Sequence, residues 1–188
     1  MPEYYLDIET TGLEPKNDQI ISIQYQRLGM ISGREEGPLN ILRSWESSEK
    51  DIIERFLPLF AGGGPFSFVS IGLNIPFMYS FLVERARIHD LDAPDPLYIL
   101  GKKPYLDLKP FLVIMNKGSF KGASLDRFAD LSFTGEQIPK MFYAKEYERI
   151  EECIEEEARE FQKLYRHLKD RAPSLVMVKG AVQTQLPL

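Results

Sequence analysis

The chain has 188 residues and a formal charge of −5 at pH 7, with 23 Lys and Arg against 28 Asp and Glu. This length suits one domain with a sizeable core and is short for two. With 44% hydrophobic and 27% charged residues, the composition is that of an ordinary globular protein. The negative charge argues against a protein that binds nucleic acid through a generally basic surface.

Cys153 is the only cysteine, which excludes an intrachain disulfide. No apolar run has the length of a membrane span, and the N-terminus lacks the basic-then-apolar layout of a signal peptide. We therefore expect a soluble, cytoplasmic protein with no membrane partner.

The beginning of the chain predicts three β-strands joined by short links. An apolar run over residues 4–6 leads into the first strand. Alternating apolar and polar residues predict a second strand over 19–27, and residues 39–42 predict a third. Strands in direct succession favour an antiparallel meander.

Helical periodicity begins after Ser48, which heads a capping box. Apolar residues over 52–60 predict a helix that ends at the glycines of 62–64. Residues 66–71 predict a buried central strand, and residues 76–89 predict a second helix.

The proline-rich segment 92–104 is predicted to be irregular, and residues 105–108 to form an edge strand. Short helices are expected over 111–115 and 124–131, and a long one over 136–169, broken near Pro139 and ended at Pro173. We thus predict one mixed α/β domain over residues 1–172, with the first strand central, and a tail over 173–188.

Two carboxylates stand at the end of the first strand, in the string Asp7-Ile8-Glu9-Thr10-Thr11-Gly12-Leu13. Residues two apart on a strand project from the same face, so Asp7 and Glu9 point toward one place. Their mutual repulsion would be removed by a divalent cation, since hard cations take carboxylate oxygens. The string therefore predicts a metal site.

Two further stretches are candidates to meet this pair. Residues 72–78 occupy a strand-to-helix junction, and Tyr147 and Glu151 share a helix face because they are four apart. A phenol beside a carboxylate, facing an Asp/Glu pair, suits metal-assisted hydrolysis of a phosphodiester.

In these motifs the chain resembles the DEDD superfamily of 3′–5′ exonucleases, in the tyrosine subgroup. It is most similar to the proofreading domains of B-family DNA polymerases and their free-standing relatives. The first family motif is matched in full over residues 7–13. The second is matched at Gly72, Asn74 and Phe77, and the third at Tyr147.

The resemblance implies a ribonuclease H-like fold with a central five-stranded mixed sheet flanked by helices. It implies one or two Mg²⁺ or Mn²⁺ ions and a single-stranded DNA or RNA 3′ end as substrate. By the same resemblance the metal ligands are Asp7, Glu9 and Glu151, and Tyr147 is catalytic with them. The residues that hold the terminal nucleotide are Thr10, Leu13, Asn74 and Phe77.

Two positions depart from the family pattern. Met78 stands where a metal-binding Asp is expected, and a thioether does not ligate Mg²⁺ usefully. Glu151 replaces the other expected Asp and keeps its charge, while Asp107 is a less favoured substitute ligand. The sequence leaves two functions open, namely a weak metal-dependent exonuclease and an inactive exonuclease fold that binds nucleic acid or a protein.

Lysines that flank the predicted site in sequence either line a path for phosphates or are scattered surface lysines, the commoner case. They include Lys117 and Lys121. The final residues 185–188 resemble the peptides by which replication proteins hold sliding clamps, but the usual final aromatic is missing. We therefore predict at most a weak clamp contact through this tail.

Overall fold

Five strands form one mixed sheet in the order β3-β2-β1-β4-β5. The structure is a computed structural model that describes the backbone of residues 1–183 and the side chains of residues 1–95 and 97–171. β1 pairs antiparallel with β2 and parallel with β4. The strands are β1 (Glu3–Thr10), β2 (Ile20–Leu28), β3 (Asn40–Arg43), β4 (Val69–Gly72) and β5 (Tyr105–Asp107).

The predicted sheet is confirmed: a meander of β1, β2 and β3 is extended by two parallel strands on the other side of β1. β1 is central, as its apolar start indicated. Gly72, at the end of β4, lies so close to β1 that a Cβ there would be 2.5 Å from the Leu6 carbonyl oxygen. Only glycine lets these two backbones approach in this way.

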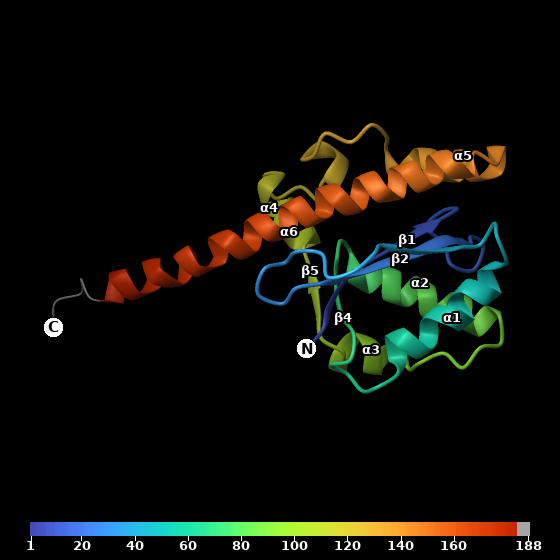
Figure 1. Ribbon diagram of the computed structural model, residues 1–188, viewed down its shortest axis with the longest axis horizontal. Helices are drawn as coiled ribbons and strands as arrows, with labels where there is room; N and C mark the ends of the chain where they lie inside the picture. The colour runs from blue at the N-terminus through green and yellow to red at the C-terminus, as the bar shows by residue number, and fades with distance from the viewer. Residues whose placement is uncertain (184–188) are drawn as a thin grey trace.

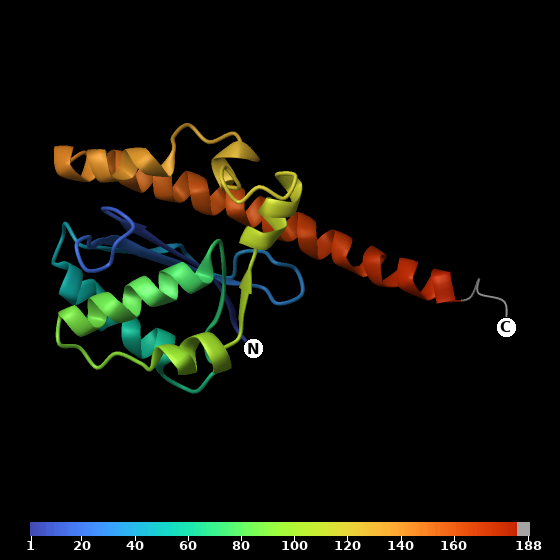
Figure 2. The ribbon, with the colours of Figure 1, turned by 180° about the vertical axis from the view of Figure 1, so that it is seen from behind.

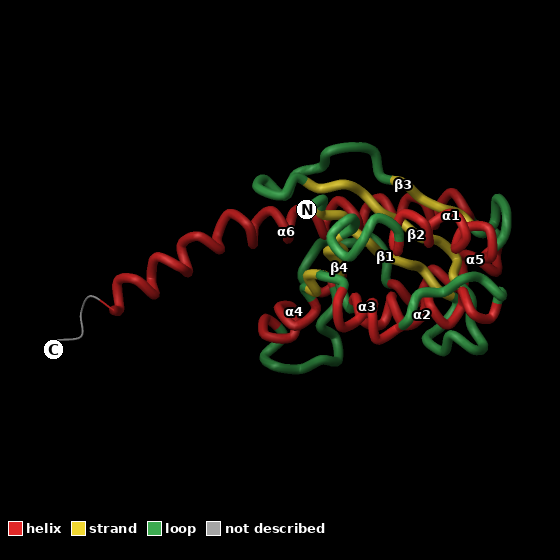
Figure 3. The backbone as a smooth tube through the Cα atoms, turned by 90° about the horizontal axis from the view of Figure 1, so that it is seen from below, coloured by secondary structure: helices red, strands yellow, loops and turns green. Residues whose placement is uncertain are grey.

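Helices cover both faces of the sheet (Figures 1 and 2). One face carries α1 (Glu49–Ala61), α2 (Ile75–Ile88) and α3 (Pro96–Lys102), which share a core with Leu6 and Ile8. The opposite face carries α5 (Ile138–Ala144) and α6 (Tyr147–Gln183), and α4 (Lys109–Met115) follows β5. Figure 3 shows α6 continuing well past the edge of the sheet. Among the described residues, no helix is both long and apolar enough to cross a membrane.

Three predicted boundaries differ from the structure. Segment 92–104 contains α3, because Pro96 lies in the first turn, where proline is tolerated, and Asp95 caps the Leu97 N–H at 2.9 Å. The helix predicted over 124–131 is only a 3₁₀ turn, Leu125–Arg127. The strand predicted over 66–71 begins at Val69.

The long C-terminal helix is divided, but not at Pro139. That proline lies in the first turn of α5, and the break occurs at Lys145, whose φ of 60° is left-handed. α6 then continues beyond Pro173 to Gln183, so the helix does not end at the predicted proline. The clamp-like residues 185–188 lie outside the described part of the chain, and the division into a domain and a tail stays a prediction.

A buried ion pair ties the β1–β2 connection to the helices. Glu49 of α1 accepts hydrogen bonds from the Ile20 backbone N–H at 2.7 Å and from the Arg85 Nε at 2.8 Å. Arg85 of α2 also donates to the Pro15 carbonyl at 3.0 Å, and the His89 Nε2 lies 2.7 Å from Glu49. These bonds fix residues 11–19, the connection that leaves the end of β1.

Candidate functional site

β1 and α6 run antiparallel across the face of the sheet that α6 covers. Each step of two residues along the strand, about 6.6 Å, is matched by one step of four residues along the helix, about 6 Å. The odd-numbered side chains of β1 therefore meet one stripe of α6 in succession. The pairs are Glu3 with Tyr165, Tyr5 with Phe161, and Asp7 with Glu157.

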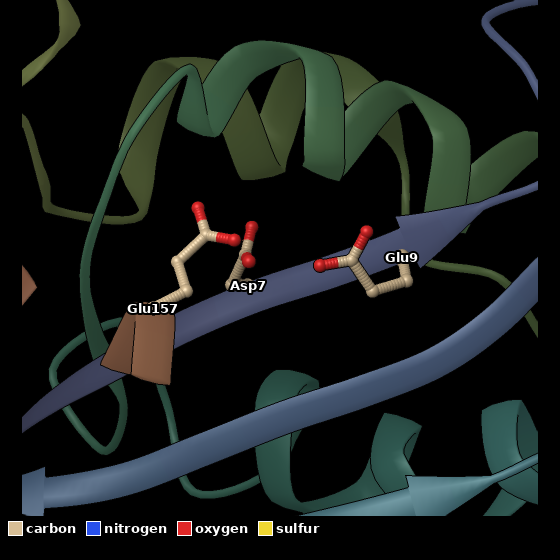
Figure 4. A group of neighbouring side chains, drawn as sticks. All are labelled: Asp7, Glu9 and Glu157. Carbon is tan, nitrogen blue, oxygen red and sulfur yellow. The ribbon is translucent and has the colours of Figure 1, made fainter. Parts of the chain in front are cut away.

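This register assembles three carboxylates. Oxygen atoms of Asp7, Glu9 and Glu157 all lie within 4.8 Å of one another. Figure 4 shows Asp7 and Glu9 side by side on β1, with Glu157 approaching from α6. The predicted common face of Asp7 and Glu9 is thus present, and the third acid is Glu157.

Burial and mutual repulsion hold protons on this cluster. Burial raises the pKa of Asp7 to about 7, against hydrogen bonds from the Ile8 backbone and the Gln24 side chain. Burial, with the charges of Asp7 and Asp126, raises the pKa of Glu157 to about 8. Burial and the charges of Asp7 and Glu157 raise the pKa of Glu9 as well. Three acids that resist ionisation together indicate a site suited to a bound positive charge.

Gln24 positions Asp7. It is the residue opposite Asp7 on β2, it is fully buried, and its Nε2 donates to the Asp7 Oδ2 at 3.0 Å. Ser22 in turn donates to the Gln24 Oε1 at 3.2 Å, which fixes the orientation of the amide. The alternation in β2 indicated a polar face here, but not that α6 buries it.

Tyr147 and Glu151 lie elsewhere on α6. The Glu151 carboxylate is held by both Arg43 Nε at 2.8 Å and Arg43 Nη2 at 2.9 Å. The Tyr147 ring stacks on Trp45, with centroids 5.2 Å apart and planes 3° apart. They share a face as predicted, but that face meets β3 and the residues after it, two strands away from β1. The structure does not bring them to Asp7 and Glu9.

Glu157 was not singled out from the sequence, although a signal was present. It is six residues after Glu151, which places it about 120° around the helix. It is also four residues before Phe161 and eight before Tyr165, both buried. An acid on an otherwise apolar stripe indicates a special role. The acidic residues that precede Glu157 in the sequence make it look like part of a solvated helix face.

Cys153 takes the position one turn before Glu157. Burial raises the pKa of its thiol to about 11, and the Glu9 carboxylate adds to the effect. The thiol is therefore protonated near neutral pH, as expected of a buried cysteine that packs against its neighbours.

The predicted nucleotide-binding residues lie near the ends of β1 and β4, on or beside the connections that follow these strands. Leu13 is 75% exposed on the loop after β1, and Thr10 Oγ1 donates to the Gly12 carbonyl at 2.6 Å. Asn74 heads α2 in a left-handed conformation, and its N–H donates to Asp107 Oδ1 at 2.8 Å. Phe77 packs beside Phe81 with centroids 5.6 Å apart. Both connections leave the sheet where β1 and β4 end.

Met78 and Asp107 have structural surroundings. Met78 is 3% exposed in the core between α2 and the sheet. Asp107 Oδ1 accepts both the Asn74 and Lys109 backbone N–H groups. Neither belongs to the carboxylate cluster among the side chains that the structure describes.

The three acids fit a hard divalent cation. All the donors are carboxylate oxygens, the ligand type that Mg²⁺ and Mn²⁺ prefer. Oxygens bound to one such ion at about 2.1 Å are at most about 4.2 Å apart, so small side-chain rotations suffice. The chemistry of the donor set thus agrees with the expected Mg²⁺ or Mn²⁺.

The raised pKa values predict that the metal-free protein loses stability as pH rises. Between about pH 4 and pH 8 the folded chain binds more protons at Asp7 and Glu157 than the unfolded chain, so unfolding is favoured as pH increases. In EDTA we expect the Tm to fall by roughly 5 °C between pH 5.5 and 8. Thermal unfolding monitored by circular dichroism measures it.

A matched pair of variants assigns that slope to the cluster. Glu157→Gln should flatten the dependence of Tm on pH, whereas Glu152→Gln, at an exposed position on the same helix, should leave it unchanged. Equal slopes in the two variants would contradict the prediction.

Comparison with known proteins identifies the fold. No protein-family model matches the chain. Exonuclease I of E. coli in complex with a dT13 oligonucleotide matches 94% of this chain and 43% of its own, with a TM-score of 0.63 and 12% identity. The zinc-bound form of the Exonuclease I–ssDNA complex matches 93% and 42%, with a TM-score of 0.63 and 13% identity. The chain has the ribonuclease H-like fold found in Exonuclease I.

The match covers only part of the Exonuclease I chains. This chain spans less than half of their length, and identities near 12% show the fold alone. A relative over most of the length is the uncharacterized protein MJ0365 of Methanocaldococcus jannaschii. It is 29% identical over 180 residues, which is 90% of this chain and 88% of that protein.

Proposed function

We propose that the protein is a metal-dependent 3′–5′ exonuclease that acts on single-stranded nucleic acid. The observation that carries the proposal is the convergence of Asp7, Glu9 and Glu157 within 4.8 Å on an Exonuclease I-like fold. A divalent ion bound there would polarise the scissile phosphate and activate water. The structural neighbours are complexes with oligodeoxynucleotides, which favours single-stranded DNA as the first substrate to test.

Each part of the site has a distinct task in this proposal. Asp7, oriented by Gln24, and Glu9 hold the cation from the strand, and Glu157 closes the site from α6. Leu13 and Phe77 offer apolar surface to the terminal base, because unpaired bases commonly stack on such side chains. The assignment of Tyr147 and Glu151 to catalysis, and with it the polymerase-type subgroup, stays a prediction.

A second candidate function is nucleic-acid binding without cleavage. Two observations favour it. Met78, at the position where the family resemblance places a metal-binding acid, is buried in the core. The residue one turn before Glu157 is Cys153, whose thiol is protonated, and not a tyrosine. A carboxylate cluster of three acids gives a weaker metal site than four.

The deciding experiment compares two glutamates on the same helix. The substrate is a 5′-labelled dT12 with Mn²⁺, and products are resolved on a denaturing gel. We expect shortening from the 3′ end, a loss of about 100-fold or more in Glu157→Gln, and a change of only a few-fold in Glu151→Gln.

Each outcome assigns the site. A large loss in Glu151→Gln with activity kept in Glu157→Gln would return the third ligand to Glu151, as the sequence predicted. If the wild type binds the oligonucleotide and leaves it intact with either Mn²⁺ or Mg²⁺, the non-cleaving function holds instead.

A further inference from the structure

A basic and aromatic lobe, residues 109–127, lies beside the acidic cluster. Strand pairing sets Asp107 level with Gly72, and Tyr5 level with Ile71. Continued by two residues, this register puts Leu108 level with Asp7, and Lys109 is the next residue. Two strand spacings, about 10 Å, separate β5 from β1. The Asp107 carboxylate joins the lobe to the predicted nucleotide-binding loop, since it accepts from both Asn74 and Lys109.

Packing links the lobe to the cluster as well. Leu108, directly before the lobe, and Leu125, within it, share a buried core with Tyr5 of β1 and Phe161 of α6. Tyr5 stands two residues before Asp7, and Phe161 stands one turn after Glu157. The lobe therefore packs against the two elements that carry the acidic cluster.

The lobe is cationic although the whole chain is acidic. Among its side chains only Asp126 is negative, and none of its cations forms an ion pair within the described part of the chain. The cations are Lys109, Lys117, Lys121 and Arg127. Cations that form no ion pair in the described part of the chain are available to phosphates.

An exposed aromatic ring stands among these cations. Phe120 is 63% exposed, and the Lys109 Nζ lies 4.8 Å from the centre of its ring. Phe111, on α4, is also partly exposed at 36%. A solvent-facing phenylalanine beside lysines is the arrangement that single-strand binders use to stack bases while cations meet the backbone.

The turn that carries Phe120 is held in place. The Asn116 side chain donates to the Ser119 carbonyl at 2.7 Å and to the Lys121 carbonyl at 3.0 Å, on either side of Phe120. The turn closes at Gly122, whose φ of 77° suits glycine. Phe120 is thus presented on an ordered loop, which lowers the entropic cost of binding.

We propose that this lobe binds the single strand upstream of the 3′ end, with a base stacked on Phe120 and phosphates on Lys109, Lys121 and Arg127. The inference rests on the proposed function and adds to it the surface that guides substrate to the acidic cluster. Phe120 acts through binding and takes no part in the chemical step.

The test is fluorescence anisotropy with 5′-fluorescein-dT12 in Mg²⁺, on an Asp7→Asn background that prevents hydrolysis. Phe120→Ala should weaken binding about tenfold, and Phe120→Trp should keep the affinity because stacking is preserved. Phe66→Ala is the matched control, since Phe66 is 55% exposed on the α1–β4 connection. It should leave the affinity unchanged.

A salt titration tests the phosphate contacts. Lys121→Ala should reduce the slope of log Kd against log salt by about 0.7, the value for one cation on a single strand. Lys102→Ala, an exposed lysine at the end of α3, should not change the slope. A smaller slope only in Lys121→Ala supports the proposal.

The negative outcomes are separable. If the parent binds dT12 and Phe120→Ala binds it equally well, the inference is wrong while the proposed function stands. If the parent binds neither dT12 nor a matching U12 RNA, both are overturned.

Discussion

Asp7→Asn is expected to lower Mn²⁺-dependent degradation of single-stranded DNA by at least 100-fold. Asp7 lies at the centre of the site, because it shares β1 with Glu9 and meets Glu157 from α6. Asparagine keeps the shape of the side chain and an oxygen for the Gln24 hydrogen bond, so the loss would reflect the missing charge. Initial rates on 5′-labelled dT12 measure it.

The same variant makes a prediction that does not depend on activity. Removing one of three crowded carboxylates relieves repulsion, so the Tm of Asp7→Asn in EDTA should be above that of the wild type near pH 8. Added Mg²⁺ should raise the Tm of the wild type, because an ion that binds only the folded state stabilises it. That rise should disappear in Asp7→Asn.

The control for both measurements is Asp92→Asn, at an exposed aspartate after α2. It should match the wild type in rate and in the response to Mg²⁺. A rate in Asp7→Asn within tenfold of the wild type would show that the cluster does not carry the chemistry.

Arg85→Met should produce the largest loss of stability, about 3–5 kcal/mol, because it leaves the Glu49 carboxylate buried without its partner. Burial raises the pKa of Glu49, but hydrogen bonds from Arg85, from His89 and from the Ile20 backbone outweigh burial. The pKa of Glu49 is therefore lowered. The Tm should fall by about 10 °C. Chemical denaturation in urea gives the free energy directly.

Arg87→Met is the matched control, since Arg87 is exposed two positions further along α2. It should change the free energy of unfolding by less than about 0.5 kcal/mol. The double variant Glu49→Gln/Arg85→Met should be less destabilised than the sum of the single variants, because no charge is left buried. Additive losses would contradict a direct coupling between the two side chains.

Much of the fold was predictable because it rests on local patterns. The strand alternation of residues 19–27 and the helical spacing after Ser48 each specify an element without reference to the rest of the chain. Successive strands then favour a meander, and the structure has β1, β2 and β3 in that arrangement. Two predictions failed because they depend on where a proline lies within a helix. Pro96 and Pro139 each lie in the first turn of a helix, where proline is tolerated.

Only the part of the candidate site that lies on a single strand was predictable. Asp7 and Glu9 lie two apart on one strand, so their convergence is a consequence of strand geometry alone. The third acid depends on how α6 crosses the sheet, and a shift of one turn changes which residue meets Asp7. Arg43, which binds Glu151 from a strand more than 100 residues earlier, could not be paired with it from sequence spacing.

The packing of β1 against α6 has a consequence for how the protein is made. It joins residues 162 positions apart in the hydrogen bond from Tyr165 to Glu3. Contacts so distant in sequence form late, because the intervening chain must first be brought together. A nascent chain on the ribosome carries Asp7 and Glu9 before Glu157, and so has no third acid until α6 emerges. Metal binding at this cluster would therefore report that the chain has been made beyond Glu157 and that α6 has packed against β1.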